Sequence, residues 1–165
     1  MPYLPRMTSD AGRQTRIAGS SVRALTVHPD QRGRLFEVLR SDDPEFIHFG
    51  QAYVTTAHPG IVKGWHRHRL QTDFFCLIQG QARFVLYDPR EDSPTRGQID
   101  VIECDGERPQ LIVIPALVYH GFKNTGTTDV ICLNCPTEPY NRATPDEEQL
   151  DPFDNDIPYD WGRPA

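Results

Sequence analysis

The chain of 165 residues lacks any apolar run of the roughly 18 residues that a membrane-spanning helix requires. Its opening residues also lack the apolar centre of a secretory signal peptide. These two absences argue against a membrane protein and against secretion, so we expect a protein of the cytoplasm. The length suits one domain, which can bury a core without disulfides or a structural metal.

The sequence also has little excess of acidic over basic residues, except in one segment. The chain has 17 Lys and Arg against 23 Asp and Glu, but seven of these acids lie between Pro145 and Asp160, where there is no base. Over the rest of the sequence acids and bases nearly balance. Nucleic-acid-binding proteins usually carry a strongly basic surface. We therefore expect no nucleic-acid partner, although single basic side chains could bind a small anionic ligand.

Cysteine is rare as well, with four in the chain. Cys132 and Cys135 form a C-x-x-C motif, which can bind zinc or carry redox chemistry. Cys132 lies in an apolar run typical of a strand, where residues three apart point to opposite faces. We therefore expect no joint site for these two thiols.

Short β-type segments, in contrast, are abundant. Runs rich in Val, Ile, Phe, Tyr and Thr alternate with turn signals, whereas no central segment shows the periodicity of a three-turn helix, and 15 prolines disfavour helices. This pattern predicts an all-β antiparallel sandwich or barrel. We expect residues 1–20 to form a flexible N-terminal arm and the aromatic-containing tail from Pro136 to pack back onto the barrel. The predicted strand segments are 21–29, 34–40, 47–56, 73–79, 81–88, 98–103, 110–115, 120–124 and 130–135.

Two motifs with histidines carry the strongest chemical signal. The spacing G-x5-H-x-H-x4-D-x6-G includes His66, His68 and Asp73, and a later P-x4-H-x3-N includes His120. On a strand His66 and His68 project to the same face, where Asp73 and His120 from neighbouring strands can join them. Three imidazoles and a carboxylate suit a first-row divalent metal. The alternative is that one or two of these histidines are buried and hydrogen-bonded without a ligand.

Together the two motifs resemble those of the cupin superfamily, with Asp73 in place of the usual glutamate and Leu117 in place of a glycine. The resemblance implies a cupin barrel, which is a double-stranded β-helix or jelly roll, here with an extended N-terminal strand and a C-terminal tail. We expect a single cupin domain over residues 21–165, including a C-terminal segment that wraps the barrel.

Six further stretches, which cover nearly all of the chain after residue 25, resemble the motifs of dTDP-4-dehydrorhamnose 3,5-epimerases. The D-x-R-x-x-S-P-T-x-G run of residues 88–97 is especially specific, because nothing general about β-proteins demands it. The resemblance implies an isomerase that is usually a homodimer exchanging N-terminal strands and that requires no metal or other cofactor. The other five stretches are "DQRGRLFE", "FGQAYVTT", "GIVKGWH", "IPALVYHGF" and "DIPYDW".

The family resemblance also assigns roles to residues. In such enzymes a histidine removes a proton beside the C4 ketone of a nucleotide-linked sugar, and the enolate is reprotonated from the opposite face. His66 matches the base, His120 orients or polarises the substrate, and Tyr140 matches the proton donor. Lys63 and Arg32 are expected to face the diphosphate. The expected substrate-binding residues are Arg32, Glu37, Gln51, Lys63, His68 and Gln71.

The leading interpretation is thus an epimerase acting at C3, C5 or both of a 4-keto-6-deoxy sugar nucleotide, in deoxysugar or polysaccharide biosynthesis. One alternative is a dTDP-sugar 3,4-ketoisomerase, because His68 and a shortened segment before Gln71 resemble those enzymes. Another is a metal-dependent oxygenase, hydrolase or small-molecule binding protein. That alternative is favoured by Asp73, which lies near the position of a family lysine. Its metal ligands would be His66, His68, Asp73 and His120.

Overall fold

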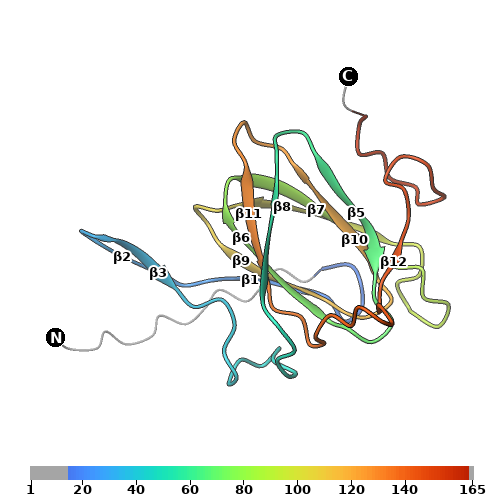
Figure 1. Cartoon of the computed structure of the whole chain (residues 1–165), viewed down its shortest axis with the longest axis horizontal. Coiled ribbons are helices and arrows are strands. Elements are labelled where there is room, and N and C mark those ends of the chain that lie inside the picture. Colours follow the sequence, from blue (N-terminus) through green and yellow to red (C-terminus); the bar gives the residue numbers. More distant parts are fainter. Residues whose placement is uncertain (1–14, 164–165) are drawn as a thin grey trace.

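The computed structural model describes residues 15–163 and shows an all-β protein (Figure 1). No helix occurs among these residues, and so none that could cross a membrane. Residues 1–14 of the predicted N-terminal arm lie outside the described range. Residues 15–20 pack against the barrel, and Ile17 is buried in its core. The packed domain therefore includes residues that precede Ser21.

Two five-stranded antiparallel sheets form the barrel. The first sheet has the strand order β1-β9-β6-β11-β4 and the second has the order β12-β5-β10-β7-β8, while β2 and β3 form a separate hairpin. The strands are β1 (Ser21–Ala24), β2 (Val27–Asp30), β3 (Gly33–Phe36), β4 (Tyr53–Ala57), β5 (Val62–Arg67), β6 (Asp73–Gln79), β7 (Gln81–Tyr87), β8 (Ile99–Asp105), β9 (Gln110–Ile114), β10 (Tyr119–Asn124), β11 (Val130–Asn134) and β12 (Glu148–Gln149).

Most predicted strand segments match the observed strands. The segments over 73–79, 81–88, 110–115, 120–124 and 130–135 agree with β6, β7, β9, β10 and β11 to within one residue at either end. The prediction over 47–56 was too long, because only its last residues join β4. The backbone N–H groups of Gly50 and Gln51 instead donate to the carbonyl of Pro136, which holds this part as a loop.

The core lies between the two sheets. Residues alternate along each strand, so β6 sends Asp73, Phe75 and Leu77 into the barrel, whereas Phe74 and Cys76 belong to a second buried cluster. Phe75 packs against Phe84 of the opposite sheet, with ring centroids 5.5 Å apart. Asp73 is therefore a carboxylate at the start of a strand whose buried residues are otherwise apolar.

Strands β5 and β10 approach each other closely at two glycines. A Cβ atom on Gly64 would lie 2.8 Å from the Cα of Gly121, a distance that side-chain-bearing residues do not tolerate. The pairing register places His66 directly opposite His120. The two glycines therefore let these strands bring two imidazoles side by side into the barrel.

The β2–β3 hairpin and the C-terminal segment are arranged differently. The β2–β3 hairpin projects away from the barrel (Figure 1) and pairs only within itself among the described residues. The C-terminal segment lies against the second sheet, where β12 pairs with β5. Trp161 is buried there against Trp65, with ring centroids 5.0 Å apart. The acidic tail is therefore an integral part of the barrel wall.

Candidate functional site

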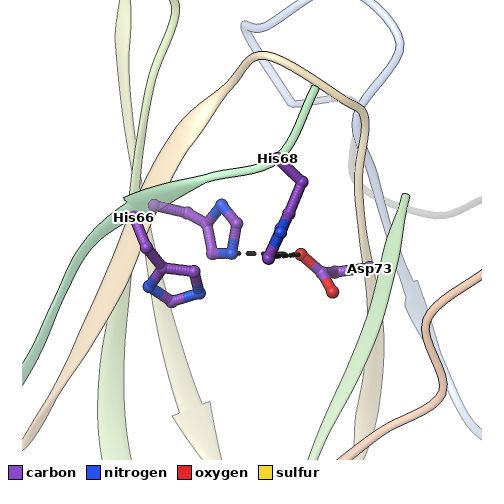
Figure 2. A group of neighbouring side chains, drawn as sticks. His66, His68 and Asp73 are labelled. Carbon is purple, nitrogen blue, oxygen red and sulfur yellow. Dashed lines mark ion pairs between the residues drawn. The ribbon is translucent and has the colours of Figure 1, made fainter. Parts of the chain in front are cut away.

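Three histidines and one aspartate converge inside the barrel, three of them labelled in Figure 2. His66 comes from β5, His120 from β10 and Asp73 from the first position of β6. His68 lies just after β5 rather than on it, yet its ring faces the same point. One ligand-type atom from each of the four residues lies within 4.8 Å of the others. The structure therefore brings together all four predicted metal ligands.

Backbone carbonyls determine where two of these imidazoles carry their protons. His68 Nδ1 lies 2.6 Å from the carbonyl oxygen of Asp146, and His120 Nδ1 lies 3.0 Å from that of Val118. A carbonyl oxygen only accepts, so each Nδ1 carries a hydrogen. A neutral ring then presents a lone pair at Nε2. Both Nε2 atoms face Asp73 Oδ2, at 3.5 Å from His68 and 3.2 Å from His120.

The two oxygens of Asp73 have different surroundings. Oδ1 accepts hydrogen bonds from Gln71 Nε2 and Asn134 Nδ2, each at 2.7 Å. Oδ2 and the Nε2 of His120 are buried, and among the described residues neither makes a well-oriented hydrogen bond. Burial raises the pKa of Asp73, but its contacts with His120, His68 and Asn134 lower that pKa to about 2. An ionised carboxylate therefore faces two imidazole nitrogens, an arrangement that a proton or a cation between them would stabilise.

His66 lines the cavity and has a perturbed pKa. Burial, and then the proximity of His120, lower the pKa of His66 well below its usual value of 6.5. The imidazole is therefore uncharged at neutral pH and keeps a lone pair with which to accept a proton. The arrangement suits a general base that needs no prior deprotonation.

A cavity of about 270 Å³ opens beside His66 and His68. Ligand pockets usually measure about 300–1,000 Å³, so this one suits a single small ring rather than a whole nucleotide sugar. Lys63 brings a positive charge to the wall, where its Nζ donates to Thr55 Oγ1 at 2.8 Å. The lining residues are Tyr53, Thr55, Lys63, Gly64, Trp65, His66, His68, Phe75, Phe122, Glu147 and Gln149.

Two predicted substrate-binding residues, Gln71 and Gln51, lie outside the cavity lining. Gln71 is buried and donates to Asp73, so it orients the carboxylate rather than facing the cavity. Gln51 lies before β4, where its backbone contacts Pro136. Neither residue lines the cavity.

Three other predicted residues lie on the surface. Arg32 is in the turn of the projecting β2–β3 hairpin and pairs with Asp30. Glu37 pairs with Arg40 just beyond that hairpin. Tyr140 is 58% exposed and does not line the cavity. A single chain therefore does not bring these residues together with the histidines.

Sequence reasoning missed several residues of the site. Tyr53 and Asn134 are paired across β4 and β11, and Asn134 links Tyr53 to Asp73. The pattern of alternate residues in "QAYVTT" could have identified Tyr53 as inward-facing. Asp146 accepts backbone hydrogen bonds from residues 69, 70 and 71 and orients His68 through its carbonyl. Nothing in the local sequence signals that role, because the contact joins segments more than 70 residues apart.

The barrel with an interior cluster of histidines defines the chain as a cupin-type protein. Comparison with known families agrees with this class and narrows it. The model of the polysaccharide biosynthesis C-terminal domain matches residues 28–148, and the chain belongs to that family.

Individual relatives point in the same direction. The spore coat polysaccharide biosynthesis protein SpsL of Bacillus subtilis is 38% identical over 145 residues, which cover 88% of this chain and 96% of that protein. The probable low-salt glycan biosynthesis epimerase Agl13 of Haloferax volcanii is 44% identical over 135 residues, which cover 81% and 86%. A dTDP sugar isomerase from Desulfovibrio desulfuricans has a TM-score of 0.85 and 32% identity, covering 90% of this chain and 94% of that one.

These findings confirm the predicted cupin fold and the likeness to dTDP-4-dehydrorhamnose 3,5-epimerases, whose solved members share this architecture. They also confirm the prediction that the chain is an isomerase of the epimerase type.

Proposed function

We propose that this protein epimerises a nucleotide-linked 4-keto-6-deoxy sugar, with His66 as the base. The observation that carries this assignment is the position of the His66 imidazole on the wall of a cavity the size of a sugar ring. Burial lowers the pKa of His66, which favours the uncharged form that a base requires. The names of the relatives support it, since they include a glycan biosynthesis epimerase and a dTDP sugar isomerase. Polysaccharide assembly is the biological context that agrees with the family match.

The proposed chemistry begins with the acidity of protons beside a ketone. His66 removes a proton from the carbon next to C4, and the electron pair of that C–H bond moves toward the ketone to form an enolate. Reprotonation of this carbon from the opposite face inverts it. Lys63, the basic residue on the cavity wall, is suited to meet the negative charge of the substrate where the diphosphate leaves the cavity.

A homodimer would complete the site. Arg32 and Glu37 belong to the projecting hairpin and the residues after it, so they can reach a cavity only if that cavity belongs to a second copy. We propose that the hairpin of one protomer lies beside the pocket of its partner, where Arg32 would face the diphosphate. The homodimer and the cytoplasmic location expected from the sequence both stay predictions.

The proposed function predicts hydrogen exchange at the substrate carbon. Incubation with nucleotide-linked 4-keto-6-deoxyhexoses in heavy water should place deuterium at C3 or C5, detected by NMR or mass spectrometry. His66→Ala should slow this exchange by about 100-fold or more, because general bases contribute about 10²–10⁴-fold. The matched control is His58→Ala, which removes an exposed histidine that pairs with Asp129 outside the cavity.

The position of the deuterium separates the related activities. Exchange at C3 with the ketone still at C4 indicates a 3-epimerase, whereas a ketone moved to C3 indicates a 3,4-ketoisomerase. No exchange with dTDP-, UDP-, GDP- or CDP-linked keto sugars, in folded protein with and without added metal, would contradict the proposal.

A bound divalent metal is a second candidate for this site. The observation that favours it is the pair of buried atoms, Asp73 Oδ2 and His120 Nε2, that make no well-oriented hydrogen bond within residues 15–163. His66, His68, Asp73 and His120 have the donor types that Fe, Mn, Ni and Zn accept. When bound, such an ion would supply positive charge to an enolate oxygen. If His66 served as a ligand it could not also act as the base, so the two proposals exclude each other at that residue.

A further inference from the structure

Epimerisation needs a second proton-transferring group besides His66, and the structure does not place the sequence-predicted one in the cavity. Tyr140 is exposed and does not line the cavity that contains His66. A donor must face the substrate from the side opposite the base, because protonation from the same side restores the original configuration. Among the described residues that line the cavity, Tyr53 is the only tyrosine.

Tyr53 and His66 belong to the two different sheets of the barrel. Tyr53 begins β4 at the edge of the first sheet, whereas His66 lies on β5 of the second sheet. On β4 the residues in phase with Tyr53 face inward, since Thr55 lines the cavity and Ala57 joins the core. The cavity therefore has a phenol from one sheet and an imidazole from the other.

Asn134 determines which hydrogen-bonding role the Tyr53 hydroxyl plays. The backbone N–H of Phe74 donates to Asn134 Oδ1 at 3.0 Å, which identifies the opposite side of the amide as Nδ2. That nitrogen donates to Asp73 Oδ1 at 2.7 Å and to the Tyr53 hydroxyl oxygen at 3.0 Å. Tyr53 is thus an acceptor in this bond, and its own hydrogen is available for a group in the cavity. Burial raises the pKa of Tyr53 to about 12, so the phenol is protonated at neutral pH.

We propose that Tyr53 is the catalytic proton donor, acting from the other sheet than that of His66 and positioned by Asn134. This assignment rests on the proposed function and names a further residue of its site. After His66 has taken the proton, the enolate C=C pair forms a new C–H bond with the Tyr53 proton, and the C4 ketone re-forms. The O–H pair stays on Tyr53 as a phenolate, which Asn134 Nδ2 stabilises by hydrogen bonding. Water then removes one proton from His66 and returns one to Tyr53, so no net proton is gained or lost.

The test compares exchange with inversion in heavy water for Tyr53→Phe. Without the donor, His66 still removes the proton and returns a deuteron to the same face. We therefore expect deuterium in the recovered substrate at a rate near that of the wild type, while epimer formation falls by about 100-fold or more. Retained exchange also shows that the variant has a folded site. Tyr87→Phe is the matched control, since Tyr87 packs with the tryptophan cluster that includes Trp65 and Trp161.

The outcomes separate this assignment from the proposed function. If the wild type shows neither exchange nor inversion, the proposed function fails and the role of Tyr53 fails with it. If the wild type shows both and Tyr53→Phe behaves like the wild type, only the role of Tyr53 is overturned. Loss of inversion with retained exchange in Tyr140→Phe, rather than in Tyr53→Phe, would assign the donor to Tyr140. Loss of exchange as well as inversion in folded Tyr53→Phe would also overturn the assignment, because the phenol would then act before the proton is removed.

Discussion

At the scale of single residues, the site depends on where protons reside. Two backbone carbonyls hold the Nδ1 hydrogens of His68 and His120, so both rings direct Nε2 toward Asp73. The side-chain amides of Gln71 and Asn134 donate hydrogen bonds to Oδ1 of Asp73. Hydrogen bonds of this kind, which orient the side chains from behind, are typical of metal ligands. They would equally hold a proton between carboxylate and imidazole.

Metal binding distinguishes these two possibilities. If the cluster binds a metal, adding Zn, Mn, Ni or Fe to metal-stripped protein without a histidine tag should raise its melting temperature. The expected stabilisation is about 2.7 kcal/mol when the free metal is about 100-fold above its Kd. Asp73→Asn should abolish the shift and remain folded, because the new amide can donate to a neutral His120 Nε2 while its oxygen accepts the two existing bonds.

The control for this experiment is Asp129→Asn, which changes an exposed aspartate beside His58. It should keep the metal-induced shift. No shift with any of the four metals, together with no metal by elemental analysis of the purified protein, would exclude the metal-bound form and leave a proton as the link between Asp73 and the imidazoles.

At the scale of structural elements, the loop before β10 is under local backbone strain. Leu117 has a φ of 69°, and it is the only non-glycine residue with positive φ among those described. Its backbone N–H donates to the carbonyl of His68 at 2.7 Å, so the loop shape also anchors the end of β5. Leucine thus occupies a conformation that glycine adopts without a steric penalty.

Leu117→Gly should therefore stabilise the protein. The left-handed conformation costs a side-chain-bearing residue about 1–2 kcal/mol, and the greater flexibility of glycine in the unfolded chain costs about 0.5–1 kcal/mol. We expect the free energy of unfolding to rise by about 0.5–1 kcal/mol, measured by urea denaturation. Leu70→Gly, at an exposed leucine without positive φ, should lower it instead. A decrease for Leu117→Gly would show that the side chain matters more than the strain.

At the scale of the whole molecule, a single copy leaves apolar surface exposed. Leu35 on β3, Phe49 before β4 and Val54 on β4 are each about 60% exposed. Strand β4 also lies at the edge of its sheet, and open edges favour pairing with another chain. A second copy would cover such surface and bring the hairpin residue Arg32 to a cavity.

We expect sedimentation at micromolar concentration to show a dimer. Leu35→Glu should shift the protein toward monomer, because it places a charge on the projecting hairpin, and should weaken substrate binding through loss of the partner's Arg32. Leu70→Glu, at a leucine that is 74% exposed in the segment between β5 and β6, should leave the association unchanged. A wild-type protein that sediments only as a monomer would contradict the homodimer.

The sequence by itself determined the features that depend on local periodicity and on spacing. Alternating apolar residues and turn signals predicted most strands, because a strand exposes its two faces in strict alternation. The spacing of His66, His68, Asp73 and His120 predicted their convergence, because it matches a barrel whose strands carry them inward.

Only the tertiary structure decided which other residues join that cluster. Asn134 reaches Asp73 and Tyr53 through pairing of distant strands, and Asp146 orients His68 across 78 positions of sequence. The same packing leaves Tyr140 on the surface. Such contacts depend on how the sheets and the C-terminal segment close around the cavity. The local pattern of residues does not predict that closure, because the closure is determined by the combined burial of side chains from the whole chain.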